Sequence, residues 1–218
     1  MKNVKAFIFD LDGVIVFTDK FHYQAWKRMA DRMGIYFDET VNNRLRGVSR
    51  MESLDIILEN YEGSLSQEEK KALAEEKKAS YRELLNTMTP QDVSTKVRRT
   101  LEQLREKGYK LAIGSSSKNA PFILEKVGLL DFFDAISDGN NITNSKPDPE
   151  VFLKAAEYLG EDPQNCIVVE DAYAGVDAAK AGGMAAAAIG DAASYEKADY
   201  VLEDFSDLLK LVSGNEDQ

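Results

Sequence analysis

Two aspartates, Asp10 and Asp12, close an apolar run near the start of the chain, in the segment FIFDLDGVI. Residues two apart on a strand project to the same face, so both carboxylates would crowd together where a buried strand ends. Two like charges at this spacing are costly to hold without a cation. A carboxylate such as Asp10 can attack phosphorus and form an acyl phosphate. The pair therefore points to phosphoryl transfer.

Further polar side chains follow the other apolar runs of the chain. Clusters of Asp and Glu suit Mg²⁺, which bridges protein carboxylates to phosphate. A cation and lysines would neutralise charge on the transferring group, and hydroxyls with backbone N–H groups would cradle phosphate oxygens. The residues in question are Ser115, Ser116, Ser117, Lys118, Asn119, Lys146, Glu170 and Asp171.

Composition limits the classes of partner. The 218 residues are 44% hydrophobic, enough for a real core, and the formal net charge is −11. We do not expect an acidic chain to bind nucleic acid or an anionic membrane, because binding to either requires a basic patch on the protein. No apolar stretch approaches the roughly 20 residues that cross a bilayer, and the opening MKNVKAFIFD meets an aspartate too early for a signal peptide. We expect a cytoplasmic monomer, with the single Cys166 in a buried strand and no internal disulfide.

The elements needed to position these residues alternate along the chain. Strand-like runs lie at 4–9, 110–114, 133–136, 166–169 and 184–190, with helical segments between them. Three of those segments end in a glycine suited to a helix C-terminus, namely Gly108, Gly128 and Gly160. This alternation predicts an α/β fold with a doubly wound parallel sheet, whose strand ends share one ligand-binding edge.

One long segment does not alternate. From 17 to 87 the sequence predicts helices only, with a cap at Ser66 and a glutamate, Glu69, three residues later. We expect an all-helical domain at 17–87, inserted after the first strand as a cap over the functional edge of the sheet. The catalytic core would then comprise 1–16 and 88–218.

The chain resembles the haloacid dehalogenase superfamily of phosphotransferases. The four motifs of that superfamily are found here in order as DLDGV, the SSS turn, KPDP and VVEDA. Within it, the segments GVIVFTDKFHYQAW, LRGVSRMESL and SSKNAPFIL are similar to those of the β-phosphoglucomutases. The resemblance covers essentially the whole chain and implies the core and cap arrangement described above.

The resemblance also implies roles in the core. Asp10 would be the nucleophile that becomes an aspartyl phosphate, and Asp12 the general acid/base. Ser115 and Lys146 would bind the transferring phosphate, and Ser116 adds a further donor beside it. Mg²⁺ would be held by Asp10, the backbone carbonyl of Asp12, Asp171, and Glu170 acting directly or through water.

In the cap, the resemblance implies a second phosphate site. Arg50 would clamp the sugar's other phosphate, with both charge and orientation, and Ser117, Lys118 and Asn119 would face it from the core. His22 would bond the acid/base aspartate at the hinge, with Thr18 as a supporting residue. The residues around the sugar would be Trp26, Leu45, Arg46, Gly47, Val48, Ser49, Ser53 and Lys77.

The implied reaction interconverts β-D-glucose 1-phosphate and D-glucose 6-phosphate through the 1,6-bisphosphate, so the partners would be small sugar phosphates. A sugar-phosphate phosphatase on the same scaffold would use the same core residues and transfer to water. A non-catalytic protein that binds phosphorylated metabolites is a third hypothesis.

Several residues also have plainer interpretations. By helical spacing His22 and Trp26 could simply pack in the cap, and Lys77 could lie on a solvated helix face. Arg50 could form a surface ion pair, and Glu170 with Asp171 could cap a helix. Asp148 and Glu150 are typical of a helix first turn. The sequence assigns no role to the loop 139–144 or to Asp191.

Overall fold

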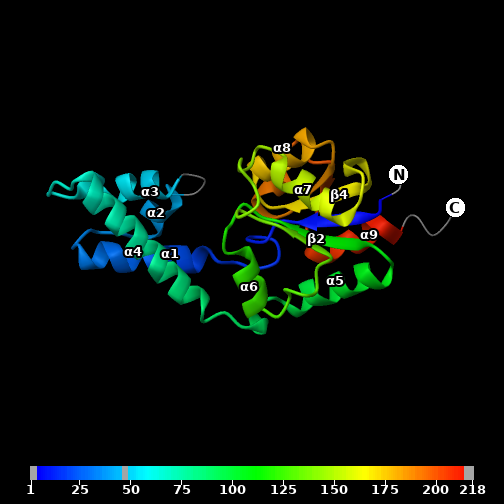
Figure 1. The fold of residues 1–218 in the computed structure, drawn as a ribbon, viewed down its shortest axis with the longest axis horizontal. Coiled ribbons are helices and arrows are strands. Elements are labelled where there is room, and N and C mark those ends of the chain that lie inside the picture. The colour runs from blue at the N-terminus through cyan, green and yellow to red at the C-terminus, as the bar shows by residue number, and fades with distance from the viewer. Residues whose placement is uncertain (1–3, 46–48, 214–218) are drawn as a thin grey trace. The chain divides into compact units, whose positions relative to one another are not determined.

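The computed structural model describes residues 4–45 and 49–213, and the described chain forms two compact units. The sheet unit comprises the described residues up to Phe17 together with those from Thr89 onward, and the helical unit runs from Thr18 to Met88. The chain thus divides at 17/18 and 88/89, where the sequence suggested 16/17 and 87/88. Figure 1 traces each unit in turn.

The sheet unit contains one parallel sheet of six strands in the order β3-β2-β1-β4-β5-β6. This confirms the predicted fold class. The last strand, β6, was not predicted, and it has only two residues. The strands are β1 Ala6–Phe9, β2 Lys110–Gly114, β3 Ala135–Ser137, β4 Cys166–Glu170, β5 Ala185–Ala188 and β6 Tyr200–Val201.

Helices cover both faces of this sheet, α7 and α8 on one and α5 and α9 on the other (Figure 1). Helices α5, α6 and α7 are followed by Gly108, Gly128 and Gly160, all with positive φ, as predicted for helix C-termini. The helices are α5 Thr95–Glu106, α6 Ala120–Lys126, α7 Glu150–Leu159, α8 Tyr173–Ala181 and α9 Leu208–Ser213, with 3₁₀ turns η2 Pro90–Asp92, η3 Pro163–Asn165, η4 Gly190–Ser194 and η5 Phe205–Asp207.

The central strand β1 is apolar on both of its faces. Ala6 and Ile8 join the core cluster that includes α7 and α8. The rings of Phe7 and Phe9 pack instead with aromatic rings such as Tyr109. A strand buried on both faces needs a continuous apolar run, which explains why the residues of β1, AFIF, are all apolar.

The helical unit has a core of its own, built from Trp26, Leu54, Leu73 and their neighbours. Ser66 and Glu69 form the predicted capping box at the start of α4. Within the described ranges, no helix is both long and apolar enough for a transmembrane span. The helices are α1 Asp19–Arg32, α2 Glu39–Asn43, α3 Arg50–Ile57 and α4 Gln67–Leu85, with the 3₁₀ turn η1 Leu58–Asn60.

Candidate active site

Parallel pairing brings the polar residues of three strands to one edge of the sheet. Phe9 of β1 lies opposite Ile113 of β2 and Val169 of β4. The next residues along these strands, Asp10 and Glu170 among them, therefore lie level with one another. Asp10 is anchored there because its backbone N–H donates to the Val169 carbonyl at 2.9 Å. The ends of these strands thus lie together at one edge of the sheet, as the sequence predicted.

Lys146 bridges two acids at this edge. Its Nζ lies 2.6 Å from Asp10 Oδ1 and 2.5 Å from Glu170 Oε1. The ammonium also lies over the ring of Phe152, 4.6 Å from its centroid. Burial by itself lowers the pKa of Lys146, but the charges of Asp10 and Glu170 outweigh burial and raise that pKa overall. Lys146 therefore stays charged and offsets the repulsion between the carboxylates.

One ammonium does not neutralise three acids. Glu170 is completely buried, and burial raises the pKa of its carboxyl although Lys146 opposes the shift. Burial, followed by the charges of Glu170, Asp10 and Asp12, raises the pKa of Asp171 to about 7. The acids at this edge therefore resist being ionised together, and a cation would remove that resistance.

The donor set fits Mg²⁺. Oxygens of Asp10, Glu170 and Asp171 all lie within 4.8 Å of one another. Mg²⁺ prefers carboxylate oxygens and water, and needs few protein ligands. Asp12 is not part of this carboxylate group, but it was expected to offer its backbone carbonyl. Its charge acts on Asp171, so Asp12 lies nearby, partly buried in the turn after β1.

Two glycines that were missed from the sequence make room for the acids. A Cβ on Gly13, whose φ is +89°, would lie 2.0 Å from Asp171 Oδ2. A Cβ on Gly175 in α8 would lie 1.9 Å from the Glu170 carboxyl carbon. Glu170 accepts a hydrogen bond from the Ala172 N–H at 2.9 Å, which holds it against that helix. Gly13 directly follows the DLD sequence, and this position could have indicated its close approach to Asp171.

The serine turn follows β2 at the same edge. Ser115 is buried, and its N–H donates to the Ser137 carbonyl at 3.0 Å. The Ser115 hydroxyl accepts the Ser117 N–H at 3.2 Å, and the Ser117 hydroxyl accepts the Asn119 N–H at 3.1 Å. Two hydroxyls thus shape the turn itself. The Ser116 hydroxyl is buried without a hydrogen-bond partner in the described structure, and Lys118 is exposed.

In the helical unit, His22 and Lys77 form a close pair. Lys77 Nζ lies 2.9 Å from His22 Nδ1, and the His22 ring stacks on Tyr81 with centroids 4.0 Å apart. Lys77 also lies over the ring of Trp26, at 4.9 Å. The Tyr81 hydroxyl donates to Thr18 at 3.1 Å. Lys77 is buried, at 6% exposed, so the interpretation of a solvated helix face is wrong for this lysine.

This pairing has a marked electrostatic effect. Burial lowers the pKa of Lys77 to about 8, with help from the charge of Arg50. Burial and the charge of Lys77 lower the pKa of His22 to about 3. At neutral pH the imidazole is therefore neutral, and because Nδ1 accepts from Lys77, its proton lies on Nε2.

The other predicted sugar-site residues lie in several places within this unit. Arg50 begins α3 and pairs with Glu75 at 2.9 Å as an exposed ion pair. Ser49 caps α3 by accepting the Glu52 N–H. The positions of Arg46, Gly47 and Val48 lie outside the described residues. Trp26, Leu45 and Ser53 are buried, the first two in the core of the unit.

Comparison with known proteins identifies the family of this chain. The family model for haloacid dehalogenase-like hydrolases matches residues 4–183. The chain is 42% identical over 207 residues to a β-phosphoglucomutase of Bacillus subtilis, covering 94% of this chain and 92% of that protein. It is 35% identical over 184 residues to a phosphorylated carbohydrates phosphatase of Thermotoga maritima, covering 83% and 82%.

Among solved structures, a β-phosphoglucomutase of Clostridium difficile matches with a TM-score of 0.81 and 41% identity, over 97% of this chain and 96% of that one. The family model spans all four motifs, from DLDGV to VVEDA. With its acids, lysine and serine turn gathered at one edge of a parallel sheet, this chain belongs to the haloacid dehalogenase-like hydrolase family.

Proposed function

We propose that this chain is a Mg²⁺-dependent β-phosphoglucomutase that interconverts β-D-glucose 1-phosphate and D-glucose 6-phosphate. The single observation that carries the chemistry is Lys146, held between Asp10 and Glu170 beside Asp171. The relatives of that name in Bacillus subtilis and Clostridium difficile, each covering more than nine tenths of the chain, support the choice of substrate. We place the enzyme in the cytoplasm, where phosphorylated sugars are found, as a monomer.

The proposed reaction starts at Asp10. A carboxylate oxygen of Asp10 attacks the phosphorus of the sugar bisphosphate, the bond from phosphorus to the sugar oxygen breaks, and Asp12 gives a proton to that oxygen. Loss of the 1-phosphate in this way leaves glucose 6-phosphate, which departs, and β-D-glucose 1-phosphate takes its place. Asp12 then takes the proton from the 6-hydroxyl as that oxygen attacks the aspartyl phosphate, and the bond from phosphorus to Asp10 breaks. The 1,6-bisphosphate so formed turns end for end and presents its other phosphate to Asp10.

Other residues of the site would bind and neutralise the phosphates. Lys146 and Ser115 would hold the transferring group, and the serine turn with Arg50 would hold the distal phosphate. Asp10, Glu170 and Asp171 would hold Mg²⁺, with the Asp12 carbonyl as a further ligand. When bound, the cation supplies positive charge that stabilises the transferring phosphoryl group.

A phosphatase that transfers to water is the alternative. The Thermotoga maritima relative, named as a phosphatase of phosphorylated carbohydrates, favours it. Both functions share the Asp10 step, so the acceptor of the phosphoryl group separates them.

The test mixes purified protein, Mg²⁺, β-D-glucose 1-phosphate and a trace of the 1,6-bisphosphate, and follows glucose 6-phosphate and inorganic phosphate separately. A mutase yields glucose 6-phosphate with little phosphate. Release of phosphate in step with substrate loss, with little glucose 6-phosphate, would instead establish the phosphatase. The α anomer is run in parallel, and Asp10→Asn serves as the inactive control for both reactions.

A further inference from the structure

Two hydrogen bonds fix the backbone around Lys146, one that closes its turn and one just before the turn. The Asp148 N–H donates to the Ser145 carbonyl at 3.1 Å and closes the turn. Just before it, the Asn144 N–H donates to Glu150 Oε2 at 2.7 Å. Because β3 ends at Ser137 and α7 begins at Glu150, no strand or helix fixes this stretch of backbone. Side-chain contacts must therefore set the place of Lys146.

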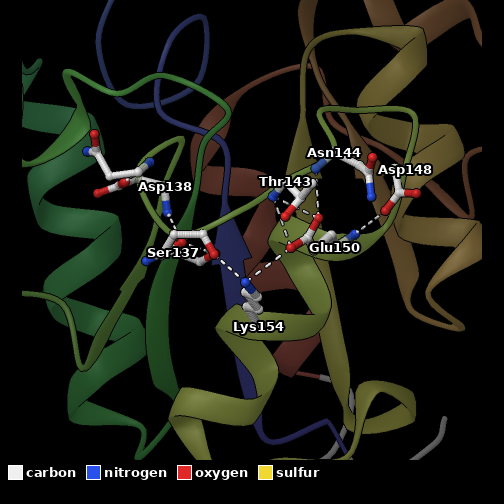
Figure 2. Close-up of polar contacts among 9 residues, drawn as sticks. Ser137, Asp138, Thr143, Asn144, Asp148, Glu150 and Lys154 are labelled. Carbon is white, nitrogen blue, oxygen red and sulfur yellow. Dashed lines mark hydrogen bonds and ion pairs between the residues drawn. The ribbon is translucent and has the colours of Figure 1, made fainter.

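Glu150 supplies most of these contacts, as Figure 2 shows. Its two carboxylate oxygens accept the Thr143 N–H at 3.1 and 3.0 Å, in addition to the Asn144 N–H. Its own N–H donates to Asp148 Oδ1 at 2.9 Å. Glu150 thus holds the chain both before and after Lys146. The Asn144 and Thr143 N–H groups, followed by Lys154, lower the pKa of Glu150, so the carboxylate stays ionised.

Lys154, one turn along α7, extends this arrangement. Its ammonium pairs with Glu150 Oε1 at 3.1 Å and donates to the Asn141 carbonyl (Figure 2). The Asn141 side-chain oxygen accepts the Asp138 N–H at 3.0 Å and the Ser137 hydroxyl at 3.3 Å. The helix α7 is therefore tied to the end of β3 through the linking loop, residues 138–144.

The linking loop also contacts the serine turn. The Gly139 N–H donates to the Ser117 carbonyl at 3.3 Å, and Asn140 Nδ2 donates to the Lys118 carbonyl at 3.0 Å. A Cβ on Gly139 would lie 2.4 Å from the Ser116 carbonyl oxygen, so only glycine allows this approach. One side of the loop thus contacts the serine turn, and the other leads into the turn that carries Lys146.

We propose that Glu150 and Lys154 are positioning residues that hold Lys146 in place between Asp10 and Glu170, and that the linking loop keeps Lys146 in register with the serine turn. The inference rests on the proposed phosphoryl transfer at Asp10. Neither residue touches the reacting atoms. Glu150 acts by fixing the backbone on both sides of Lys146, so that the long lysine side chain reaches both acids.

The test is a double-mutant cycle between Glu150→Ala and Lys146→Ala, measured on the rate of phosphoryl transfer to whichever acceptor the enzyme uses. Misplacing a catalytic group by about 1 Å can cost up to about a hundredfold, so we expect Glu150→Ala to lower kcat about ten- to hundredfold with a smaller change in KM. In the Lys146→Ala background the same substitution should change kcat by less than about twofold, because non-additivity marks residues that act together.

The control is Glu157→Ala, which removes an exposed carboxylate two turns along the same helix and should leave kcat unchanged. Lys154→Met should cause a smaller loss than Glu150→Ala, since the Thr143 and Asn144 contacts remain. If Glu150→Ala does not fold, Glu150→Gln replaces it in the cycle, because the amide keeps one acceptor oxygen. An equal loss in both backgrounds, or a loss no greater than that of Glu157→Ala, would overturn the proposal.

A readout without turnover separates this inference from the proposed function. In a crystal structure of the Glu150→Ala protein, we expect Lys146 Nζ to lie beyond hydrogen-bond distance of Asp10 Oδ1, with the serine turn unmoved. Lys146 found unchanged between Asp10 and Glu170 would refute the positioning role, whatever reaction the enzyme catalyses. Absence of all phosphoryl transfer in the unmodified protein would refute the proposed function and leave this structural prediction to be decided by the crystal.

Discussion

Lys77 Nζ lies 2.9 Å from His22 Nδ1, so a buried ammonium donates to a neutral imidazole within the helical unit. His22 is the single histidine of the chain. A pH-dependent contribution to stability from an imidazole can therefore be assigned to this one contact.

The first prediction concerns that pH dependence. The folded-state pKa of His22 is about 3, below the 6.5 of an exposed ring. As pH falls from about 6.5 towards 3, His22 binds a proton in the unfolded state but not in the folded state, so the free energy of unfolding decreases in this window. Between about pH 7.5 and pH 5 the loss is about 2 kcal/mol. Urea denaturation should show it in the unmodified protein.

The matched variant is His22→Gln, which has no imidazole to titrate. Over the same pH range, the free energy of unfolding of this variant should change by about 2 kcal/mol less than that of the unmodified protein. Equal pH dependence in the two proteins would mean that the His22 ring takes up its proton over the same pH range in the folded and unfolded states.

The second prediction concerns Gly13. Gly13 and Gly108 have nearly the same φ, +89° and +86°, but a Cβ on Gly108 would meet no atom within 4 Å. Gly108→Ala should lose about 1 to 2 kcal/mol of stability from backbone strain alone. Gly13→Ala should lose about 1 to 3 kcal/mol more, because its Cβ collides with Asp171. Equal losses by urea denaturation would show that Asp171 moves aside freely.

The third prediction concerns Mg²⁺. When all are ionised, Asp10, Glu170 and Asp171 carry more negative charge than Lys146 offsets, and a ligand that binds only the folded state raises the Tm. About 10 mM Mg²⁺ should raise the Tm by several degrees, measured without substrate. Asp171→Asn should reduce that rise and, without Mg²⁺, should not lower the Tm, since a repulsive charge has been removed.

The exposed Asp131→Asn substitution is the control for a general loss of charge. It should preserve the response to Mg²⁺. An Asp171→Asn protein that still responds fully would place the cation elsewhere.

The fourth prediction concerns Arg50. Its ion pair with Glu75 is exposed, so it stabilises the fold by less than about 1 kcal/mol. Arg50→Ala should therefore leave the Tm nearly unchanged. If Arg50 holds the distal phosphate, the same variant should lower mutase turnover at least tenfold, by an order-of-magnitude estimate for a lost charge-assisted contact. Hydrolysis of acetyl phosphate, which has no distal phosphate, should change little.

Arg44→Ala is the matched control, because Arg44 also forms an exposed ion pair in this unit, with Glu59 at 2.6 Å. It should affect neither reaction. If Arg50→Ala reduces both reactions equally, Arg50 does not bind the distal phosphate.

The sequence predicted five of the six strands of the described sheet, because each of these five overlaps a short apolar run. The runs at 110–114 and 166–169 match β2 and β4 to within one residue. The strand β6 could not be found in this way, since two residues such as Tyr200 and Val201 carry no periodic signal.

Lys77 shows where local composition misleads. It lies in the charged run EEKKALAEEKK, which suggests a solvated face. However, Leu73, Lys77 and Tyr81 recur at intervals of four along α4, and all three are buried. The helical period was the better guide, because burial follows the face of the helix and not the average charge of the segment.

Glu150 could not be assigned from the sequence for a different reason. A carboxylate after KPDP is typical of a helix first turn, and Glu150 does begin α7. Its bonds to the Thr143 and Asn144 N–H groups depend on how an irregular loop folds back on the helix. Such a return has no pattern in the local sequence.

The place of β1 in the sheet has a consequence for synthesis on the ribosome. The strand β1, which Asp10 directly follows, pairs with β2 and β4, and no other strand lies against it in the described sheet. Both neighbours are translated long after β1, at residues 110–114 and 166–170. The helical unit, in contrast, is one continuous stretch of chain that ends at Met88. The first strand of the nascent chain therefore lacks one of its two partners until β4 is made, and no truncated translation product that stops before β4 carries an assembled active site.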